Sequence, residues 1–337
     1  MKIAEQRLDA WVWLINSYHL LLVIYAVLRV TMATKLWWVA ALDTFALYYF
    51  LPLILTVPML IVLRGRNSAI IGSLLLLVGI IWFRPPLHTS RIASDTLRVI
   101  TYNTLHSNPQ LEDDARWLLT QEADVIILQE ISAEADEPRL APLRRYYPSY
   151  AYISGSVRIF SKYPIIDNDI ILIQDSANWY VRRYALRSKL NVNGELITVY
   201  SVHLDLPINR NEARFPIGLN VPVLGILAHY DETSRNTQIR NLVADATAQD
   251  TPVIIAGDFN TSHTSAAYHI LTQAGLRDSF AGAGNGFGFT FPATDTIPPL
   301  IRIDYIWHSP DLKAVSAMRG MQRGSDHYPV IVDFEMP

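Results

Sequence analysis

The sequence of 337 residues contains no cysteine. Disulfides, thiolate metal sites and cysteine nucleophiles are therefore excluded. The absence does not assign the protein to a compartment, because proteins on either side of a membrane can lack cysteine. It limits the chemistry of the protein and leaves its location open.

An excess of positive charge is also lacking. Residues 1–94 hold 8 Lys and Arg against 3 Asp and Glu, and the remaining residues hold 20 against 28, so that net charges of +5 and −8 give the total of −3. Non-specific binding of nucleic acid needs a basic surface, because the affinity comes from neutralising phosphates. The acidic part of the chain is a poor match to a general nucleic-acid binder, although a locally basic groove remains open.

Long apolar runs are confined to the first 84 residues. They cover Trp11 to Ala33, Ala40 to Leu63 and Ser68 to Phe83. About 20 apolar residues are needed for a helix to cross the hydrocarbon core, and the short third run spans it only if Asn67 and Arg84 reach the interface. A cleaved signal peptide has one such run, not three. Residues 1–84 are therefore predicted to form about three transmembrane helices at 11–33, 40–63 and 68–83, with interfacial aromatics at Trp37, Trp38 and Trp82.

Lysine and arginine predict the orientation of these helices. Lys2 and Arg7 precede the first run, and Arg64 and Arg66 lie between the second and the third, whereas the opposite short loop carries Lys35. The positive-inside rule then places the N-terminus in the cytoplasm and the C-terminal domain outside.

Residues 85–96 are predicted to be a linker, because paired prolines stop the helix and favour extended chain. Beyond them, short β-branched runs alternate with amphipathic stretches, and so many strands with few helices between them predict two packed sheets with helices outside. Strands are expected at 97–102, 125–128, 157–160, 184–192, 196–202, 253–256, 303–307 and 330–334, and helices at 111–122 and 237–248.

Polar side chains recur where these apolar strands end. Carboxylate, amide and imidazole groups that converge from several strands would form an oxygen-rich site, which suits Mg²⁺ or Mn²⁺. For Asp258 and Asn260 the alternative is a plain turn after a strand. The residues in question are Asn103, Glu130, His203, Asp258, Asn260, Asp304, Asp326 and His327.

The order of the surrounding motifs resembles the endonuclease/exonuclease/phosphatase (DNase I-like) superfamily. The motifs are VITYNTL, VIILQE, VYSVHLD, VIIAGDFN, RIDYIW and GSDHYP. The resemblance covers about Leu97 to Phe334 and implies a metal-dependent hydrolase of phosphoester bonds. It also implies an α+β fold at 97–337, a four-layered α/β/β/α sandwich of two mixed sheets.

The resemblance assigns roles to the candidate residues. Glu130 would ligate the metal, with Asn103 beside it and Asp326 helping. Asp258 would orient and deprotonate the attacking water, with Asn260 holding the phosphate. His327 would donate to a phosphate oxygen while Asp304 holds its ring, and His203 would be a second donor. A histidine in the VHLD string disfavours the apurinic endonucleases, which lack it.

Two segments bear on the substrate. Residues 207–230 are unusually apolar for a connection, so they either contact the bilayer or a lipid tail or pack on their own domain. Residues 279–292 form a Gly/Phe-rich loop of a kind that can move over a site.

The leading hypothesis is that the protein hydrolyses a lipid-linked phosphate. It would do so at the surface of a bacterial plasma membrane, with an extracytoplasmic catalytic domain. Membrane-anchored bacterial members of the superfamily that the chain resembles have been linked to envelope phospholipids and cell-wall lipid carriers, so the resemblance fits this class of substrate. The alternatives are an extracytoplasmic DNase I-like nuclease, which the net charge of −8 disfavours, and a catalytically silent membrane scaffold. The oligomeric state stays open.

Overall fold

A computed structural model describes residues 2–32, 35–63, 65–89, 95–132, 136–153, 156–176, 182–210, 212, 214, 217–218 and 224–336, with side chains from Asp9 onward. Ala33, Arg64, part of the predicted linker and part of the apolar segment at 207–230 lie outside these residues. The chain divides into two compact units. The helical unit comprises Met1–Arg84, Ala213–Tyr230 and Thr264–Ala266, and the sandwich unit comprises Pro85–Glu212, Asp231–His263 and Ala267–Pro337.

The helical unit contains two helices that are long and apolar enough to cross a membrane. They are α1 (Lys2–Met32), over Asp9–Met32, and α5 (Arg66–Phe83). Between them the chain bends by 76° from α2 (Trp37–Asp43) into Ala46–Val62, which contains α3 (Ala46–Phe50) and α4 (Leu53–Val62). The apolar stretch at 40–63 is therefore not one straight helix. Counting this bent pair gives up to three candidate spans, and their number stays a prediction.

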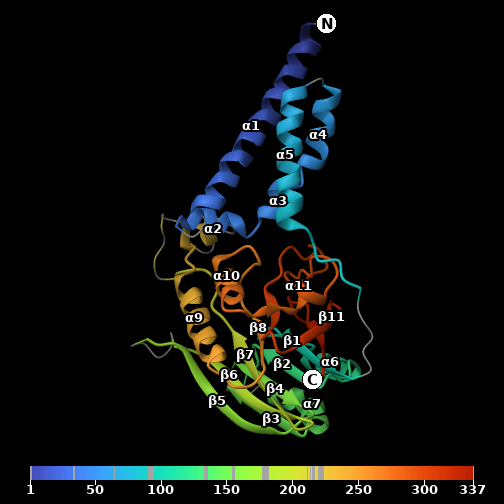
Figure 1. Ribbon diagram of the computed structural model, residues 1–337, viewed down its shortest axis with the longest axis vertical. Coiled ribbons are helices and arrows are strands. Elements are labelled where there is room, and N and C mark those ends of the chain that lie inside the picture. Colours follow the sequence, from blue (N-terminus) through green and yellow to red (C-terminus); the bar gives the residue numbers. More distant parts are fainter. Residues whose placement is uncertain are drawn as a thin grey trace. The chain divides into compact units, whose positions relative to one another are not determined.

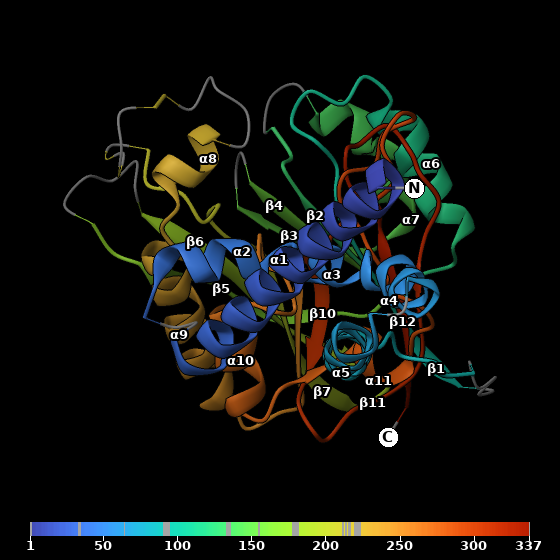
Figure 2. The same cartoon turned by 90° about the horizontal axis from the view of Figure 1, so that it is seen from above.

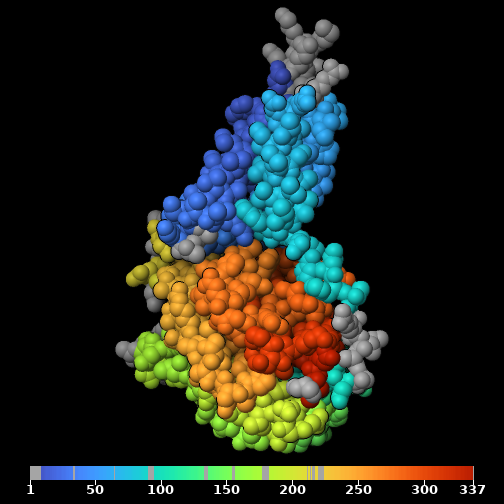
Figure 3. Space-filling view, in the orientation of Figure 1, coloured from blue at the N-terminus to red at the C-terminus, as the bar shows by residue number. Residues whose placement is uncertain are grey.

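Apolar side chains of the helical unit lie on its outside as well as inside. Leu22, Leu53 and Leu75 are buried in one apolar cluster of this unit. The helices α4 and α5 lie side by side, and α1 slants past them (Figures 2 and 3). Facing outward, Leu55 and Val62 are 76% and 80% exposed. A water-facing surface of a helix normally carries polar residues, so this outer face has the composition of one that contacts lipid.

The sandwich unit contains two six-stranded sheets (Figure 1). The first has the order β11-β12-β1-β2-β4-β3, and the second has the order β5-β6-β7-β8-β10-β9. Each sheet has one parallel pair, β1 with β2 and β7 with β8, among antiparallel neighbours. The strands are β1 (Thr96–Asn103), β2 (Val125–Gln129), β3 (Ser149–Ile153), β4 (Val157–Ser161), β5 (Ile165–Gln174), β6 (Arg183–Val192), β7 (Glu195–His203), β8 (Val253–Asp258), β9 (Arg277–Asp278), β10 (Asp304–His308), β11 (Lys313–Arg319) and β12 (Val330–Glu335).

Three apolar layers hold the sandwich unit together. Between the sheets, β-branched residues such as Val99, Ile127 and Val199 are fully buried. Ile239 of α9 packs against the second sheet, and Leu118 of α6 packs against the first. The prediction of an α/β/β/α sandwich with two mixed sheets is confirmed. The helices of this unit are α6 (Leu111–Thr120), α7 (Ala141–Tyr146), α9 (Thr233–Thr247), α10 (Ala266–Gln273) and α11 (Ser279–Ala283), and a 3₁₀ turn spans Glu137–Leu140. The remaining short helix, α8 (Leu224–His229), belongs to the helical unit.

Candidate active site

The two parallel strand pairs bring polar side chains to one end of each sheet. In the first sheet, Asn103 at the end of β1 pairs with Gln129 of β2, so Glu130 follows directly. In the second sheet, His203 at the end of β7 pairs with Asp258 of β8. Asp304, which begins the antiparallel strand β10, also pairs with Asp258. Carboxyl ends of parallel strands share one edge, and this explains why residues distant in sequence meet here.

Asn103 links the two sheets at the strand ends where the candidate residues meet, a region called here the mouth of the sandwich. Its Nδ2 atom donates to Oε1 of Glu130 and to Oδ2 of Asp258, with both donor–acceptor distances at 3.0 Å. Its Oδ1 atom accepts the Leu105 N–H at 3.1 Å. Asn103 thus fixes the separation of two carboxylates that come from different sheets.

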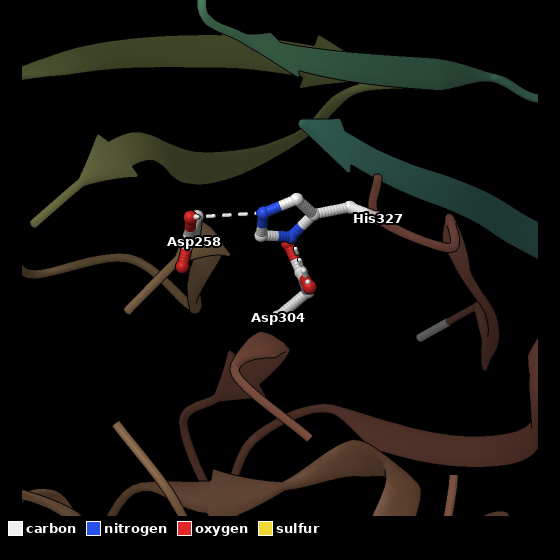
Figure 4. Close-up of side chains that lie close together, drawn as sticks. All are labelled: Asp258, Asp304 and His327. Atoms are coloured by element: carbon white, nitrogen blue, oxygen red, sulfur yellow. Dashed lines mark hydrogen bonds and ion pairs between the residues drawn. The ribbon is translucent and has the colours of Figure 1, made fainter. Parts of the chain in front are cut away.

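The ring of His327 lies between two carboxylates (Figure 4). Nδ1 lies 2.9 Å from Oδ2 of Asp304, and Nε2 lies 3.8 Å from Oδ2 of Asp258. Burial alone would lower the pKa of His327, but the charges of Asp304 and Asp258 outweigh it and raise this pKa to about 10. Burial, reinforced by the charge of Asp304, also raises the pKa of Asp258 above its usual value in spite of His327. The imidazolium is therefore favoured, beside a carboxylate that has become a stronger base.

Glu130 and His203 form the more open side of the cluster. Nε2 of His203 lies 3.7 Å from Oε1 of Glu130 and 3.7 Å from Oδ2 of Asp258. Oε2 of Glu130 accepts the backbone N–H of His106 at 2.9 Å. Burial would raise the pKa of Glu130, but the hydrogen bonds from Asn103 and His106 outweigh it, so the pKa lies below its usual value. The backbone of Glu130 has a φ of 61°, in the left-handed region, which is an uncommon conformation for a residue other than glycine.

The remaining two candidates lie at the edge of the cluster. The side chain of Asp326 is 41% exposed, and its Oδ1 lies 4.0 Å from Nε2 of His327. The backbone N–H of Asn260 donates to Asp258 at 2.8 Å, whereas its side-chain Nδ2 donates to the carbonyl of Leu204 at 2.8 Å. All eight sequence-predicted residues therefore belong to one connected group. The predicted contact of Asn260 with phosphate stays a prediction, because its amide nitrogen bonds the backbone.

Two sets of side chains in this group could hold a cation. Ligand atoms of Asp258, Asp304 and His327 lie within 4.8 Å of one another, and Oδ1 of Asp304 accepts no hydrogen bond among the described residues. A protonated imidazole has no lone pair to offer a metal, however, and the two neighbouring carboxylates keep His327 protonated. Glu130 and Asp326 instead present oxygens whose side chains are 26% and 41% exposed, so phosphate and water can reach them. Open carboxylate oxygens of this kind fit a hard divalent ion better than a protonated imidazole does.

Several supporting residues were not foreseen from the sequence. Ser325 donates to the carbonyl of Asn103 at 2.7 Å and accepts the N–H of His327 at 3.1 Å. Buried Asp114 accepts hydrogen bonds from Tyr102 and Asn108, and from Arg323 and Gly324 just ahead of Ser325. These bonds fix the loop that carries Asp326 and His327. Ser325 meets Asn103, and Asp114 meets Arg323 and Gly324, across more than 200 residues, so no local pattern indicated these contacts.

The Gly/Phe-rich loop also contributes to the site. The ring centroid of Phe291 lies 5.0 Å from that of His327, and the peptide bond between Phe291 and Pro292 is cis. The loop is tied down by the N–H of Tyr328, which donates to the carbonyl of Thr290 at 2.8 Å. His106 is exposed, and its backbone N–H donates to Glu130. In the sequence, the Gly/Phe-rich composition was the signal that predicted a position of this loop beside the site.

The family model for the endonuclease/exonuclease/phosphatase family matches residues 100–327. The chain belongs to the endonuclease/exonuclease/phosphatase family. Members of this family are phosphoesterases or nucleases and generally use a divalent metal. The matched region contains all eight candidate residues.

Solved structures of the endonuclease/exonuclease/phosphatase family share the sandwich fold. A family protein from Bacteroides vulgatus is 19% identical, with a TM-score of 0.56. The match covers 72% of this chain and 100% of the other. The mannosyl-6-phosphatase Bt3783 of Bacteroides thetaiotaomicron is 18% identical, with a TM-score of 0.53 and coverage of 71% and 100%. D. rerio TDP2, solved with a single-strand DNA product, is 18% identical, with a TM-score of 0.53 and coverage of 72% and 100%. Among curated proteins, none matches this chain.

Proposed function

We propose that this protein is a membrane-anchored, divalent-metal-dependent phosphoesterase that hydrolyses a phosphate ester or pyrophosphate bond of a lipid-linked substrate. The observation that carries the hydrolase part is the connected group of Glu130, Asn103, Asp258, His327 and Asp304 at the mouth of the sandwich. Phosphoryl transfer to water requires neutralised phosphate oxygens, a placed water and a positioned proton donor. The group contains side chains for each of these tasks.

Each side chain has a task that follows from its surroundings. Asp258, whose burial raises its pKa, accepts the proton of the attacking water. His327, held charged by Asp304, donates to a non-bridging phosphate oxygen. His203, near both Glu130 and Asp258, is placed to donate to the phosphate or to the leaving oxygen.

Glu130, with Asn103 beside it and Asp326 helping, would hold Mg²⁺ or Mn²⁺. Bound there, the ion supplies positive charge to the phosphate oxygens. Asn103 acts from its side by holding Glu130 and Asp258 at a fixed spacing, through hydrogen bonds of 3.0 Å to each.

The outer surface of the helical unit supports the membrane part of the proposal. The helices α1 and α5 are candidate spans, and outward-facing residues such as Val30 and Ile81 are 73% and 61% exposed. Exposed apolar surface of this extent is costly in water and favourable in hydrocarbon. With three spans, the positive-inside rule places the sandwich unit outside the cytoplasm.

The substrate is proposed from the setting of the site. An anchored phosphoesterase encounters lipid phosphates at high local concentration, and an acidic sandwich unit repels polyanions such as DNA. Among the similar structures, one is called a mannosyl-6-phosphatase and another is a complex with a single-strand DNA product, so the fold itself is compatible with nucleic acid as well. Nuclease activity is therefore the second outcome to be tested.

A substrate panel tests the proposal. Detergent-purified protein would be assayed with Mg²⁺, with and without EDTA, on undecaprenyl pyrophosphate, phosphatidylinositol, sphingomyelin and plasmid DNA, with Asp258→Asn as the inactive control. EDTA-sensitive release of phosphate or of a phosphorylated head group from one lipid, absent in the variant, is expected. Nicking of DNA with no lipid turnover would replace the lipid substrate by nucleic acid. No turnover of any substrate would favour a silent scaffold.

A further inference from the structure

The segment that contains α8 is separated by more than 100 residues from the N-terminal helices, yet it packs with α2. Leu227 and Tyr230 lie against Trp37, Ala40 and Ala41 in one apolar cluster. Arg214 strengthens this junction, because its guanidinium carbon lies 4.8 Å from the ring centroid of Trp37 while its Nε donates to the carbonyl of Tyr230 at 2.9 Å. The segment is thus fastened to α2, which directly follows the candidate span α1.

The buried face of α8 holds small residues and a histidine, whereas its exposed face is apolar. Gly225, Ala228 and His229 are buried. On the opposite arc, Leu224 and Ile226 are each 51% exposed, and Leu227 is partly exposed. A short helix that packs on one side and faces water on the other would carry polar residues on the second side. This arc carries none.

The position of α2 indicates that the exposed arc of α8 lies at the membrane–water boundary. The helix α2 begins five residues after α1 ends and bends by 76° from Ala46–Val62. If α1 crosses the bilayer, a turn that directly joins it to the next span lies at the membrane–water boundary. Its aromatic residues fit that depth, since Trp37 packs inward and Trp38 is 38% exposed. An element fastened to α2 lies at the same depth.

We propose that α8 is a membrane-interface element whose Leu224 and Ile226 insert into the lipid boundary. It follows β7, which ends at His203, and leads into α9 through Asp231 and Glu232, so both ends of the insertion continue into the sandwich unit. The inference rests on the membrane insertion of α1 that the proposed function includes, and its experiment separates the two. It predicts a lipid contact made by the catalytic part of the sequence itself.

The absence of native cysteine allows a direct test. Single cysteines would replace Ile226, the outward-facing Leu21 of α1, and Asp250, whose side chain is 87% exposed in the sandwich unit. Each variant would carry an environment-sensitive fluorophore in nanodiscs with or without doxyl-labelled phosphatidylcholine. We expect blue-shifted emission and strong quenching at positions 21 and 226, and neither effect at position 250.

The outcomes are distinguishable. Quenching at position 21 without quenching at position 226 would overturn the role of α8 and leave membrane anchoring intact. Absence of quenching at both positions would overturn the anchoring and the inference together. A second substitution, Leu224→Cys, repeats the measurement on the same arc and guards against a local effect of one label.

Discussion

Nδ1 of His327 and Oδ2 of Asp304 are 2.9 Å apart, and both side chains are buried. Asp304 begins a strand of the second sheet, whereas His327 lies in the loop that leads into a strand of the first. The contact therefore ties the two sheets together, as the hydrogen bonds of Asn103 also do. It also fixes which nitrogen of His327 faces Asp258.

Substituting Asp304 tests this relationship. Asp304→Asn keeps the shape of the side chain but removes the charge that favours the imidazolium, and we expect turnover to fall by at least ~10²-fold. Asp258→Asn and His327→Ala should each have an effect of at least the same order. Asp311→Asn, an exposed carboxylate between β10 and β11, is the matched control. Turnover of Asp304→Asn close to that of the control would show that hydrolysis does not need the Asp304 charge.

The titration of His327 gives a prediction that does not depend on substrate. In EDTA-treated protein, Asp304 and Asp258 outweigh burial and hold the pKa of His327 at about 10, against 6.5 for an ordinary histidine. A folded-state pKa above the unfolded one contributes stability that is fully present below pH 6.5 and is lost as the pH rises toward 10. NMR of ¹³C-labelled histidine, assigned with His327→Asn, should show one imidazole still protonated at pH 8. Titration near pH 6.5 would contradict the assigned electrostatics.

A buried ion pair outside the site should dominate the stability of the sandwich unit. Nη2 of Arg302 lies 2.6 Å from Oδ2 of Asp278, with side chains only 6% and 2% exposed. Arg302→Met leaves a buried carboxylate unpaired and should lower the free energy of unfolding by about 3–5 kcal/mol. Lys313→Met, which removes the exposed partner of Glu335, should cost at most ~1 kcal/mol. Equal urea midpoints for the two variants would contradict this.

The same pair predicts a pH dependence. Burial would raise the pKa of Asp278, but Arg302 and further hydrogen bonds outweigh it and hold the pKa below 3.8. Its contribution to stability is therefore present above pH 3.8 and is lost as the pH falls through the lower folded-state value. Asp278→Asn should flatten that acid limb of the stability curve, and an unchanged limb would assign the acid sensitivity to other groups.

The sidedness of the membrane is open to a labelling test. Glu195→Cys, on an exposed position of β7, should react with an impermeant thiol reagent on intact cells. Asn67→Cys, at the start of α5, should react only after lysis, because the positive-inside rule places that turn in the cytoplasm. The opposite pattern would reverse the proposed orientation.

Strands with a regular apolar pattern could be predicted from the sequence. All eight expected strands are present, because buried β-branched runs such as Val253–Ala256 have few alternatives to a sheet. The edge strand β5 escaped prediction, because Asp167, Asn168 and Asp169 interrupt its apolar residues and the strand is largely exposed. The two-residue strand β9 is set entirely by its partner β10.

The candidate site could be predicted because each of its residues ends or follows a strand, and the ends of strands converge. The residues that hold the site in place could not be predicted. Asp114 meets Gly324 across 210 residues, and nothing near either residue indicates the pairing. Likewise, hydropathy measures the length of an apolar stretch but not its direction, so the bend after α2 was not foreseen.

The central claim is that Glu130 holds a divalent ion that the hydrolysis requires. Hydrolysis of the lipid pyrophosphate in nanodiscs, measured against Mg²⁺ concentration for the wild type and Glu130→Gln, tests it most directly. The account predicts no turnover in EDTA, recovery with Mg²⁺, and a Mg²⁺ requirement at least ~10-fold higher in the variant. EDTA-resistant turnover, or the same Mg²⁺ requirement in both proteins, would contradict it.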